Sequence, residues 1–303
     1  MKILIVARCK HEQYAPFIIE QVDALEKQGM QCQYFGIHDK GLLGYIKHIQ
    51  SFKRVISDFK PDIIHAHYGL CGLFANIQRQ IPVVTTYHGS DINLFLPRCL
   101  SRLAIMLSAL NIFVSQKCID RVHPHNNYTL LPCGVSLENF PNITQKDARE
   151  QIGLKGNTKY ILFAGSFDNS IKNPSLAIAS AKLVEGANLL ELKGYSRSEV
   201  ALLMQAVDVL LMTSHSEGSP QVIKEALAYG CPIVSVDVGD VSGLIKDVDG
   251  CYIAHPNPKS IANCLKKAIA FGKRTSGQTI IVKYQLSNEL IAKKLIQCYN
   301  GLL

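Results

Sequence analysis

Residues 207–237 read VDVLLMTSHSEGSPQVIKEALAYGCPIVSVD, and their pattern indicates the fold class. The apolar runs VDVLLMTS and PIVSVD are typical of buried strands. Between them, Ser219 is expected to cap a helix, Pro220 to occupy its first position, and Gly230 to end it just after Tyr229. A strand, a helix and a second strand in this order predict a parallel sheet that is covered by helices.

The same alternation extends along the chain. In the first half, strands are predicted at residues 2–7, 32–37, 62–67, 82–87, 111–115 and 128–132. In the second half, strands are predicted at residues 159–165, 188–192, 207–214, 232–237 and 251–254. The segments between them place apolar residues at helical spacing, so both halves are expected to be α/β layers with parallel sheets.

Polar and turn-forming residues gather without apolar periodicity at 137–150, which is the expected linker. We therefore expect a first Rossmann-like domain at 1–145 and a second at 146–286. Residues 287–303 are predicted to form an amphipathic helix, capped by Ser287, that packs back on the first domain. Two such layers joined by one linker would leave a cleft between the carboxyl ends of their strands, where ligands of open α/β sheets bind.

Composition excludes several classes of function. The 303 residues are 48% hydrophobic and 18% charged, with a net charge of +8, which is a globular composition. The ten cysteines form no CxxC pair and no tight cluster, so neither a zinc site nor a disulfide framework is expected, and a cytoplasmic location is predicted. Because no binding motif or interleaved aromatic residues accompany the basic charge, no nucleic-acid partner is expected.

Two carboxylates lie in the opening stretch, Glu217 in the predicted loop and Glu225 within the predicted helix. The helix starts at the carboxyl edge of the sheet, so its free N–H groups suit a phosphate. Carboxylates nearby would accept hydrogen bonds from the hydroxyl groups of a sugar or a ribose. The spacing alone equally allows a purely structural interpretation, in which Glu217 lies in the first turn of the helix and Glu225 is a solvated surface residue. It leaves the binding and the structural interpretation open.

The opening stretch and several others resemble segments of a known enzyme family. EGSPQVIKEALAYGCPIVS resembles the E-x7-E segment of the family 4 (group 1) glycosyltransferases, which are sugar-nucleotide-dependent enzymes of the GT-B fold. Further pieces match in the family's order: APFIIEQVDALEKQG, PDIIHAH, TTYHGSD, VSQKCID, LLPCGVSLENF and ILFAGSFDNSIKNPSLAIASAKL. The resemblance covers nearly the whole chain. It implies a GT-B protein whose first domain binds the acceptor and whose second binds the sugar nucleotide.

The resemblance implies roles for individual residues of the second domain. Glu217 matches the glutamate that binds hydroxyl groups of the donor sugar, and Glu225 matches the one that binds the ribose. Lys172 matches the lysine that neutralises the donor diphosphate and assists its departure. The other donor-binding residues implied are Gly165, Ser166, Gly218, Ser219, Pro220 and Val222.

The first domain contributes the loop YHGSD, which is similar to the family's H-G-x-D loop. The histidine of that loop, His88 here, approaches the donor sugar near the reacting carbon, so the implied catalytic residues are Lys172, Glu217 and His88. The implied acceptor-side residues are His67, His88, Gly89 and Asp91.

No metal or cofactor is expected. The nucleotide sugar is a substrate, and in the family a lysine and helix dipoles take the place of a divalent ion. His65 and His67 share one face of a predicted strand, which could suit a metal. The sequence places no carboxylate or third histidine near them, so a metal site is not expected there.

The chain also departs from the family's pattern. Ser166 stands where an arginine is common, so one phosphate-binding cation is absent or supplied from elsewhere. Arg197 is a candidate substitute, although a solvated helix arginine is the simpler interpretation. The loop ARCKHEQYAPF lacks the usual Gly-Gly pair, so its contact with the donor phosphate or the acceptor is not assigned. The stretch VEGANLLELKGYSRSE is shorter than usual, so the nucleotide base also stays unassigned.

The resemblance implies transfer of a hexose-type sugar from a nucleotide sugar to the hydroxyl of a glycan or lipid-linked acceptor. Retention of the anomeric configuration and a place in cell-surface polysaccharide or glycolipid biosynthesis are expected. Two alternatives stay open. One is a sugar-nucleotide epimerase or hydrolase of the same fold. The other is a catalytically inactive, sugar-nucleotide-binding partner subunit, which the absent arginine favours.

A basic amphipathic pattern runs through residues 44–60. Its cations, with two that follow later in the chain, are Lys47, Lys53, Arg54, Lys60, Arg98 and Arg102. A solvated helix face is the simpler interpretation. The alternative is peripheral contact with an anionic membrane that carries a lipid-linked acceptor, which would place the protein at the inner face of the cell membrane.

Overall fold

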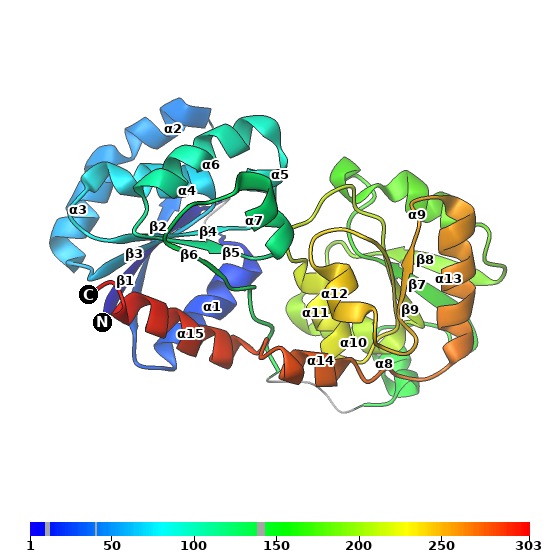
Figure 1. The fold of residues 1–303 in the computed structure, drawn as a ribbon. Coiled ribbons are helices and arrows are strands. Elements are labelled where there is room, and N and C mark those ends of the chain that lie inside the picture. The colour runs from blue at the N-terminus through cyan, green and yellow to red at the C-terminus, as the bar shows by residue number, and fades with distance from the viewer. Residues whose placement is uncertain (10–12, 40, 138–142) are drawn as a thin grey trace. The chain divides into compact units, whose positions relative to one another are not determined.

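The computed structural model describes residues 1–9, 13–39, 41–137 and 143–303. Parts of the predicted linker and of the loop ARCKHEQYAPF lie outside the described residues. The chain divides into two compact units, Met1–Gly134 with Leu286–Leu303, and Val135–Gln285 (Figure 1). In the described residues, no helix is long and apolar enough to cross a bilayer.

The first unit contains a parallel sheet of six strands in the order β2-β1-β3-β4-β5-β6. The strands are β1 (Lys2–Arg8), β2 (Gln31–Ile37), β3 (Ile63–His67), β4 (Val83–Tyr87), β5 (Leu110–Phe113) and β6 (Tyr128–Leu130). The helical segments are α1 (Pro16–Glu26), α2 (Gly41–Lys47), α3 (Ile49–Phe59), α4 (Gly69–Ala75), η1 (Asn76–Gln78), α5 (Ser90–Asn93), α6 (Phe95–Leu107), α7 (Gln116–Val122) and α15 (Asn288–Asn300). Both faces of this sheet are covered, as the unbroken apolar strands predict.

Strand β1 shows how the two faces are built. Successive side chains of a strand point to opposite faces, so Ile3 and Ile5 pack with α1 and α15, whereas Leu4 and Val6 pack with α3 and α4. Each of these side chains is fully buried. The strand is therefore the centre of two separate apolar layers.

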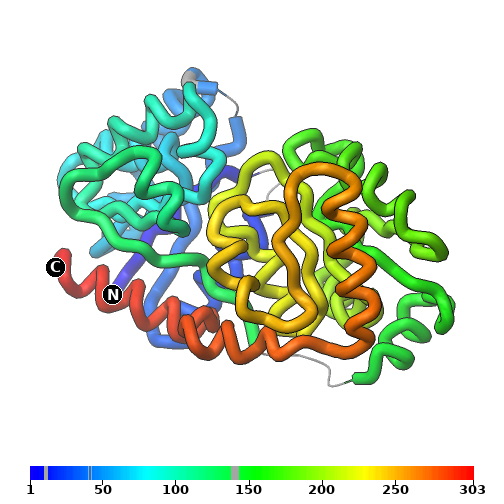
Figure 2. Tube along the Cα trace, turned by 45° about the vertical axis from the view of Figure 1, so that its right-hand side comes forward, coloured from blue at the N-terminus to red at the C-terminus, as the bar shows by residue number. Residues whose placement is uncertain are grey.

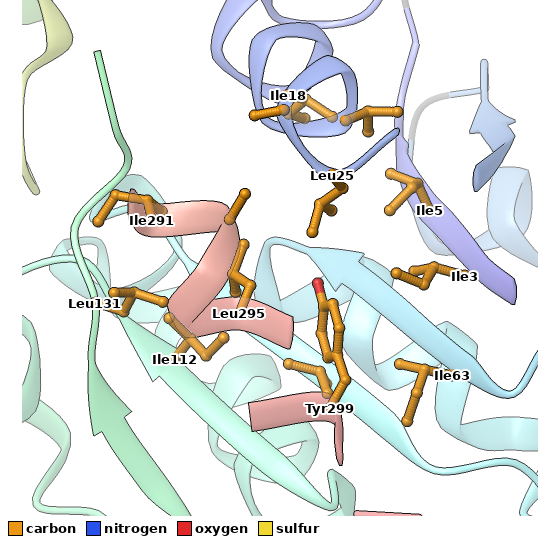
Figure 3. Close-up of a cluster of buried hydrophobic side chains, with 14 of the residues drawn as sticks. Ile3, Ile5, Ile18, Leu25, Ile63, Ile112, Leu131, Ile291, Leu295 and Tyr299 are labelled. Atoms are coloured by element: carbon orange, nitrogen blue, oxygen red, sulfur yellow. The ribbon is translucent and has the colours of Figure 1, made fainter. Parts of the chain in front are cut away.

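The C-terminal helix α15 belongs to the first unit. Ser287 caps it, with its hydroxyl accepting the N–H of Leu290 at 3.3 Å, which confirms the predicted cap. Figure 2 shows this red helix running beside the blue N-terminal segments. Figure 3 shows its residues Leu295 and Tyr299 in the apolar layer that also contains Ile3 and Ile63.

The second unit contains a parallel sheet of five strands in the order β11-β10-β9-β7-β8. The strands are β7 (Lys159–Phe163), β8 (Ala187–Glu191), β9 (Val209–Met212), β10 (Ile233–Val236) and β11 (Tyr252–Ala254). The helical segments are α8 (Gln145–Gln151), η2 (Ser170–Lys172), α9 (Pro174–Ala181), α10 (Arg197–Ala206), α11 (Gln221–Ala228), α12 (Val241–Ile245), α13 (Pro258–Phe271) and α14 (Gly277–Lys283). Helices α9 and α13 bury one face, and α10, α11 and α12 lie on the other (Figure 1).

Two local predictions were wrong. Helix α8 begins within the predicted linker, where Thr144 and Asp147 form a capping box that starts a helix without apolar periodicity. Helix α11 begins at Gln221, so the N-cap position belongs to Pro220 and the predicted Ser219 cap is absent. The hydroxyl of Ser219 instead donates to the carboxylate of Asp240 at 2.6 Å. The predicted stop is confirmed, because Gly230 follows the helix with a φ of +62°.

Strand order determines where ligands can approach each sheet. In the second sheet, β7 lies between β8 and β9, so the connections leaving β7 and β9 run to opposite faces. Such a switch point leaves the loops at the carboxyl ends of the two strands open to a ligand. In the first sheet the equivalent position lies between β1 and β3.

Candidate active site

The switch point of the second unit carries an ion pair between two predicted site residues. The Nζ atom of Lys172 donates to Oε1 of Glu217 at 2.6 Å. Lys172 ends η2, which follows β7, and Glu217 lies in the loop after β9. Their side chains are 23% and 15% exposed, so both are largely removed from water yet still open to a ligand. Sequence spacing identified each residue but not their contact.

Three features hold Lys172 in place. The hydroxyl of Thr213, at the end of β9, donates to the carbonyl groups of Lys172 and Asn173 at 2.9 Å each. The N–H of His215 donates to the carbonyl of Ile171 at 2.9 Å. A Cβ atom at Gly165 would lie 2.8 Å from Cγ of Lys172, so the missing side chain makes room for the stem of the lysine.

The loop that carries Glu217 is supported by the segment after β10. Gly239 adopts a φ of +56°, and a Cβ atom there would meet the carbonyl group of Gly218. The adjacent Asp240 accepts the hydroxyl of Ser219 at 2.6 Å. Glycine at 239 thus allows two backbone segments to approach closely, which fixes the loop that precedes α11. Pro220 and the half-buried Val222 form the start of that helix, whose first N–H groups have no partner within the helix.

Glu225 forms a second ion pair at the same helix. Its Oε1 accepts from Nη1 of Arg197 at 2.7 Å, and its side chain is only 11% exposed. The interpretation of Glu225 as a solvated glutamate is wrong, whereas Arg197 is paired but still half exposed to solvent. Arg197 begins α10 and remains 52% exposed. Lys224, next to Glu225, is fully buried, and its Nζ donates to Gln221 at 3.1 Å.

The position of the missing family arginine is occupied by a short polar network. The hydroxyl of Ser166 donates to Asp168, and Lys193 pairs with the same carboxylate at 2.8 Å. The hydrogen bond from Lys193 lowers the pKa of Asp168. The N–H of Phe167 donates to Glu191 at 2.7 Å. Two cations, Lys193 and Arg197, therefore lie on the segments that follow β8.

The first unit brings three histidines together at the ends of β3 and β4. Nδ1 of His67 lies 3.0 Å from Nε2 of His88, and the rings of His65 and His67 stack at 4.6 Å between centroids. Sequence spacing did not indicate a third histidine near the pair on β3, and the structure brings His88 there. Because β3 and β4 are neighbours in register, with His67 opposite Thr86, their carboxyl ends bring His67 and His88 side by side.

Two of the three histidines, His65 and His67, are buried and neutral, and His88 is partly buried. His65 and His67 are completely buried, and burial lowers the pKa of His65 to about 3 and that of His67 well below its ordinary value. Nδ1 of His65 lies 2.6 Å from the hydroxyl of Tyr299, and Nε2 lies 2.7 Å from that of Thr86. Among the described residues, no three His, Cys, Asp or Glu side chains form a group that could hold a metal ion. Metal independence itself stays a prediction.

Asp91 organises the loops beside this cluster. Its Oδ1 accepts the N–H groups of His88 and Gly89 at 3.0 Å each, and Oδ2 accepts that of Gly69 at 3.0 Å. Burial raises its pKa to about 6, although these N–H groups act in the opposite direction. The residue is 6% exposed, and its hydrogen bonds join the loop after β3 to the loop after β4. Contact of Asp91 with an acceptor stays a prediction.

Sequence reasoning missed the residues that support the site. Thr213, Gly239 and Asp240 carry no motif of their own, and they act only through the loop after β9. A glycine in the loop just after a strand, as in VDVGD, is the one signal that pointed to a close backbone approach.

Two family profiles match consecutive parts of the chain. "Glycosyltransferase Family 4" matches residues 23–139, and "Glycosyl transferases group 1" matches residues 137–270. The candidate teichuronic acid biosynthesis glycosyltransferase TuaC of Bacillus subtilis is 26% identical over 264 residues, which span 74% of this chain and 68% of TuaC. The Escherichia coli UDP-Gal:alpha-D-GlcNAc-diphosphoundecaprenol alpha-1,3-galactosyltransferase is 24% identical over 278 residues, which span 74% of this chain and 70% of that enzyme.

Solved structures show the same fold. Sucrose-phosphate synthase from Thermosynechococcus elongatus has a TM-score of 0.83 at 18% identity, covering 99% of this chain and 98% of its own. Anabaena HepE, solved in complex with UDP, has a TM-score of 0.74 at 16% identity, covering 99% of this chain and all of its own. With two consecutive family profiles and this fold, the chain belongs to the family 4 (group 1) glycosyltransferases and has the GT-B fold of two Rossmann-like units.

Proposed function

We propose that this glycosyltransferase moves a hexose-type sugar from a nucleotide sugar to an acceptor hydroxyl with retention of configuration. The acceptor is a glycan or a lipid-linked sugar of cell-surface polysaccharide or glycolipid biosynthesis. The observation that carries the proposal is the ion pair of Lys172 and Glu217 at the switch point between β7 and β9. A cation and a carboxylate held side by side suit the diphosphate and the sugar hydroxyls of one donor.

In the proposed reaction, the bond between the anomeric carbon and the diphosphate oxygen breaks while the acceptor oxygen bonds to the same face of that carbon. The acceptor's proton passes to the departing diphosphate. Lys172 and the first N–H groups of α11 stabilise the negative charge that develops on the diphosphate. Glu217 holds donor hydroxyls and Glu225 the ribose. Because these cationic groups lie within the chain, we propose that no divalent metal is required.

We assign the role of the missing second cation to Arg197. Its guanidinium already pairs with Glu225, the proposed ribose ligand, and its side chain is half exposed. A bound diphosphate would attract this guanidinium away from the carboxylate of Glu225. Lys193 offers the internal comparison, since it is equally exposed but pairs with Asp168 instead.

A thermal-shift screen against UDP-, GDP- and ADP-sugars tests the donor site. A donor that binds the folded state at 100 times its Kd should raise the melting temperature by about 5 °C or more. The shift should shrink in Glu225→Gln and Arg197→Ala, and persist in Lys193→Ala and in the surface control Lys146→Ala. A flat response to every donor contradicts the proposal. Donor binding with release of free sugar and no transfer would identify a hydrolase instead.

A further inference from the structure

Helix α6 turns its large apolar side chains toward solvent. Its buried residues are the small Ser101 and Ala104. Its exposed apolar side chains are Phe95 (73%), Leu96 (71%), Leu103 (49%), Met106 (80%) and Leu107 (40%). A surface helix of a globular domain normally does the reverse, with its apolar stripe against the core.

The packing of α6 on α4 explains why these side chains stay outside. A Cβ atom at Gly69 of α4 would clash with the side chain of Ser101, so the two helices meet through small residues. No space remains between them for a leucine or a phenylalanine. The apolar side chains of α6 are therefore exposed because of the close packing of α6 on α4, and not because the helix is loosely packed.

An apolar groove of about 350 Å³ continues this face. It is lined by residues of α2, α3, α4, η1 and the end of α6, with Leu70 and Phe74 among them. Ile46, Ile77 and Leu107 border it and are 54%, 52% and 40% exposed. Figure 1 shows α2, α4 and α6 together on one side of the first unit. We call the exposed residues of these helices the α2–α6 face.

The charge of the α2–α6 face has a single sign. The segments 41–47, 69–79 and 95–107 contain four cations, Lys47, Arg79, Arg98 and Arg102, and no aspartate or glutamate. The guanidinium of Arg98 lies 5.8 Å from the ring centroid of Phe95, so cation and apolar surface are interleaved. Lys47, Arg98 and Arg102 were already noted in the basic pattern of the sequence, and the structure places Arg79 at the same groove.

We propose that the α2–α6 face docks on a bilayer of anionic phospholipid. Phe95, Leu96 and Met106 would enter the boundary between headgroups and acyl chains, the groove would take an acyl segment, and the four cations would meet anionic headgroups. A second copy of the chain fits less well. A symmetric dimer places the same patch on both sides, which would oppose two faces of like charge. The proposal stands apart from the sugar chemistry, because lipid binding needs no donor.

Co-sedimentation of the full chain with vesicles tests the proposal. We expect binding to vesicles of phosphatidylcholine mixed with phosphatidylglycerol, and little binding to phosphatidylcholine alone. The double variant Phe95→Ser/Met106→Ser should bind about tenfold more weakly or worse. Its control is Val282→Ser, because Val282 is 68% exposed in the other unit. Since all these side chains are exposed, an unchanged melting temperature will show that the variants fold.

The charge contribution is tested with Arg98→Gln/Arg102→Gln, which should weaken binding about 25-fold, at about fivefold for each cation. The matched control is Lys266→Gln/Lys267→Gln on the exposed side of α13. Equal binding to neutral and anionic vesicles would overturn the proposal, as would no binding to either. Sedimentation velocity adds a further test. A dimer that Phe95→Ser/Met106→Ser dissociates would assign the face to a second copy and also overturn it.

Discussion

The two units place very different chemistry at the carboxyl ends of their strands. At the ends of β7 and β9, the second unit presents charged pairs, Lys172 with Glu217 and, nearby, Arg197 with Glu225. At the end of β3, the first unit presents two stacked, fully buried, neutral histidines, His65 and His67. Two parallel sheets thus support one region that can exchange ionic partners and another whose buried imidazoles stay neutral.

The difference follows from burial. An ion pair whose side chains are 15–23% exposed can open when an anion or a hydroxyl group replaces one partner. Water and the ligand then solvate the separated charges, which lowers the cost of breaking the pair. A completely buried imidazole has no such compensation, so its proton affinity falls. We therefore expect substitutions of the ion pairs in the second unit to change turnover, and substitution of the buried His65 to change how stability depends on pH.

The largest expected effect is on Lys172. Removing the cation in Lys172→Ala takes away the charge that stabilises the leaving diphosphate, so kcat should fall by about 10²–10³. Glu217→Ala should fall by a similar factor through loss of the sugar hydroxyl contacts. Lys146→Ala is the matched control, because Lys146 is 81% exposed in an i,i+4 pair of the same unit. Wild-type turnover in both Lys172→Ala and Glu217→Ala would contradict the assignment of this pair to catalysis.

A smaller effect is expected at Gly165, which has no side chain and lies against the stem of Lys172. The added methyl of Gly165→Ala would lie 2.8 Å from Cγ of Lys172, so the lysine must move. Because small displacements of a catalytic group lower rates strongly, we expect kcat to fall about tenfold while the fold persists. Gly243→Ala is the control, since a Cβ atom at Gly243 meets nothing within 4 Å. Equal turnover in the two variants would show that Lys172 is not held by this contact.

The comparison also shows which features the sequence could predict. Both parallel sheets follow from apolar strand runs and helical spacing, and Glu217, Glu225 and Lys172 lie within contiguous motifs. The pairing of Lys172 with Glu217 depends on β7 and β9 being neighbours, which strand order alone determines. The contact of His67 with His88 likewise depends on the register of β3 with β4. Sequence spacing carries no information on strand order, so these contacts could not be predicted.

Local sequence signals also failed where tertiary contacts replaced them. Ser219 has the residue type and position of an N-cap, but its hydroxyl donates to Asp240 and the helix starts without a side-chain cap. A solvated helix arginine was the simpler interpretation of Arg197, which is half exposed but also meets Glu225 from another helix. In both cases a partner distant in sequence offers a stronger, charge-assisted hydrogen bond.

The smallest expected effect concerns the histidine cluster and is a change in pH dependence. His65 has a pKa of about 3 in the folded state, against about 6.5 when unfolded, so between these values the unfolded state binds one more proton. Its contribution to stability is therefore complete above about pH 6.5 and is lost as the pH falls toward 3. Each pH unit within that range should remove about 1.4 kcal/mol.

The variant His65→Asn keeps a polar side chain that can bond to Tyr299 and Thr86 but does not titrate. Urea unfolding followed by circular dichroism at pH 7, 6 and 5 should show a shallower decline for this variant, by about one proton. His255→Asn, at an exposed position in the other unit, should leave the wild-type slope unchanged. Parallel curves for wild type and His65→Asn would mean that this imidazole accepts a proton in the folded state. The first unit would then resemble the second in holding charge at its strand ends, and the contrast between the two regions would fail.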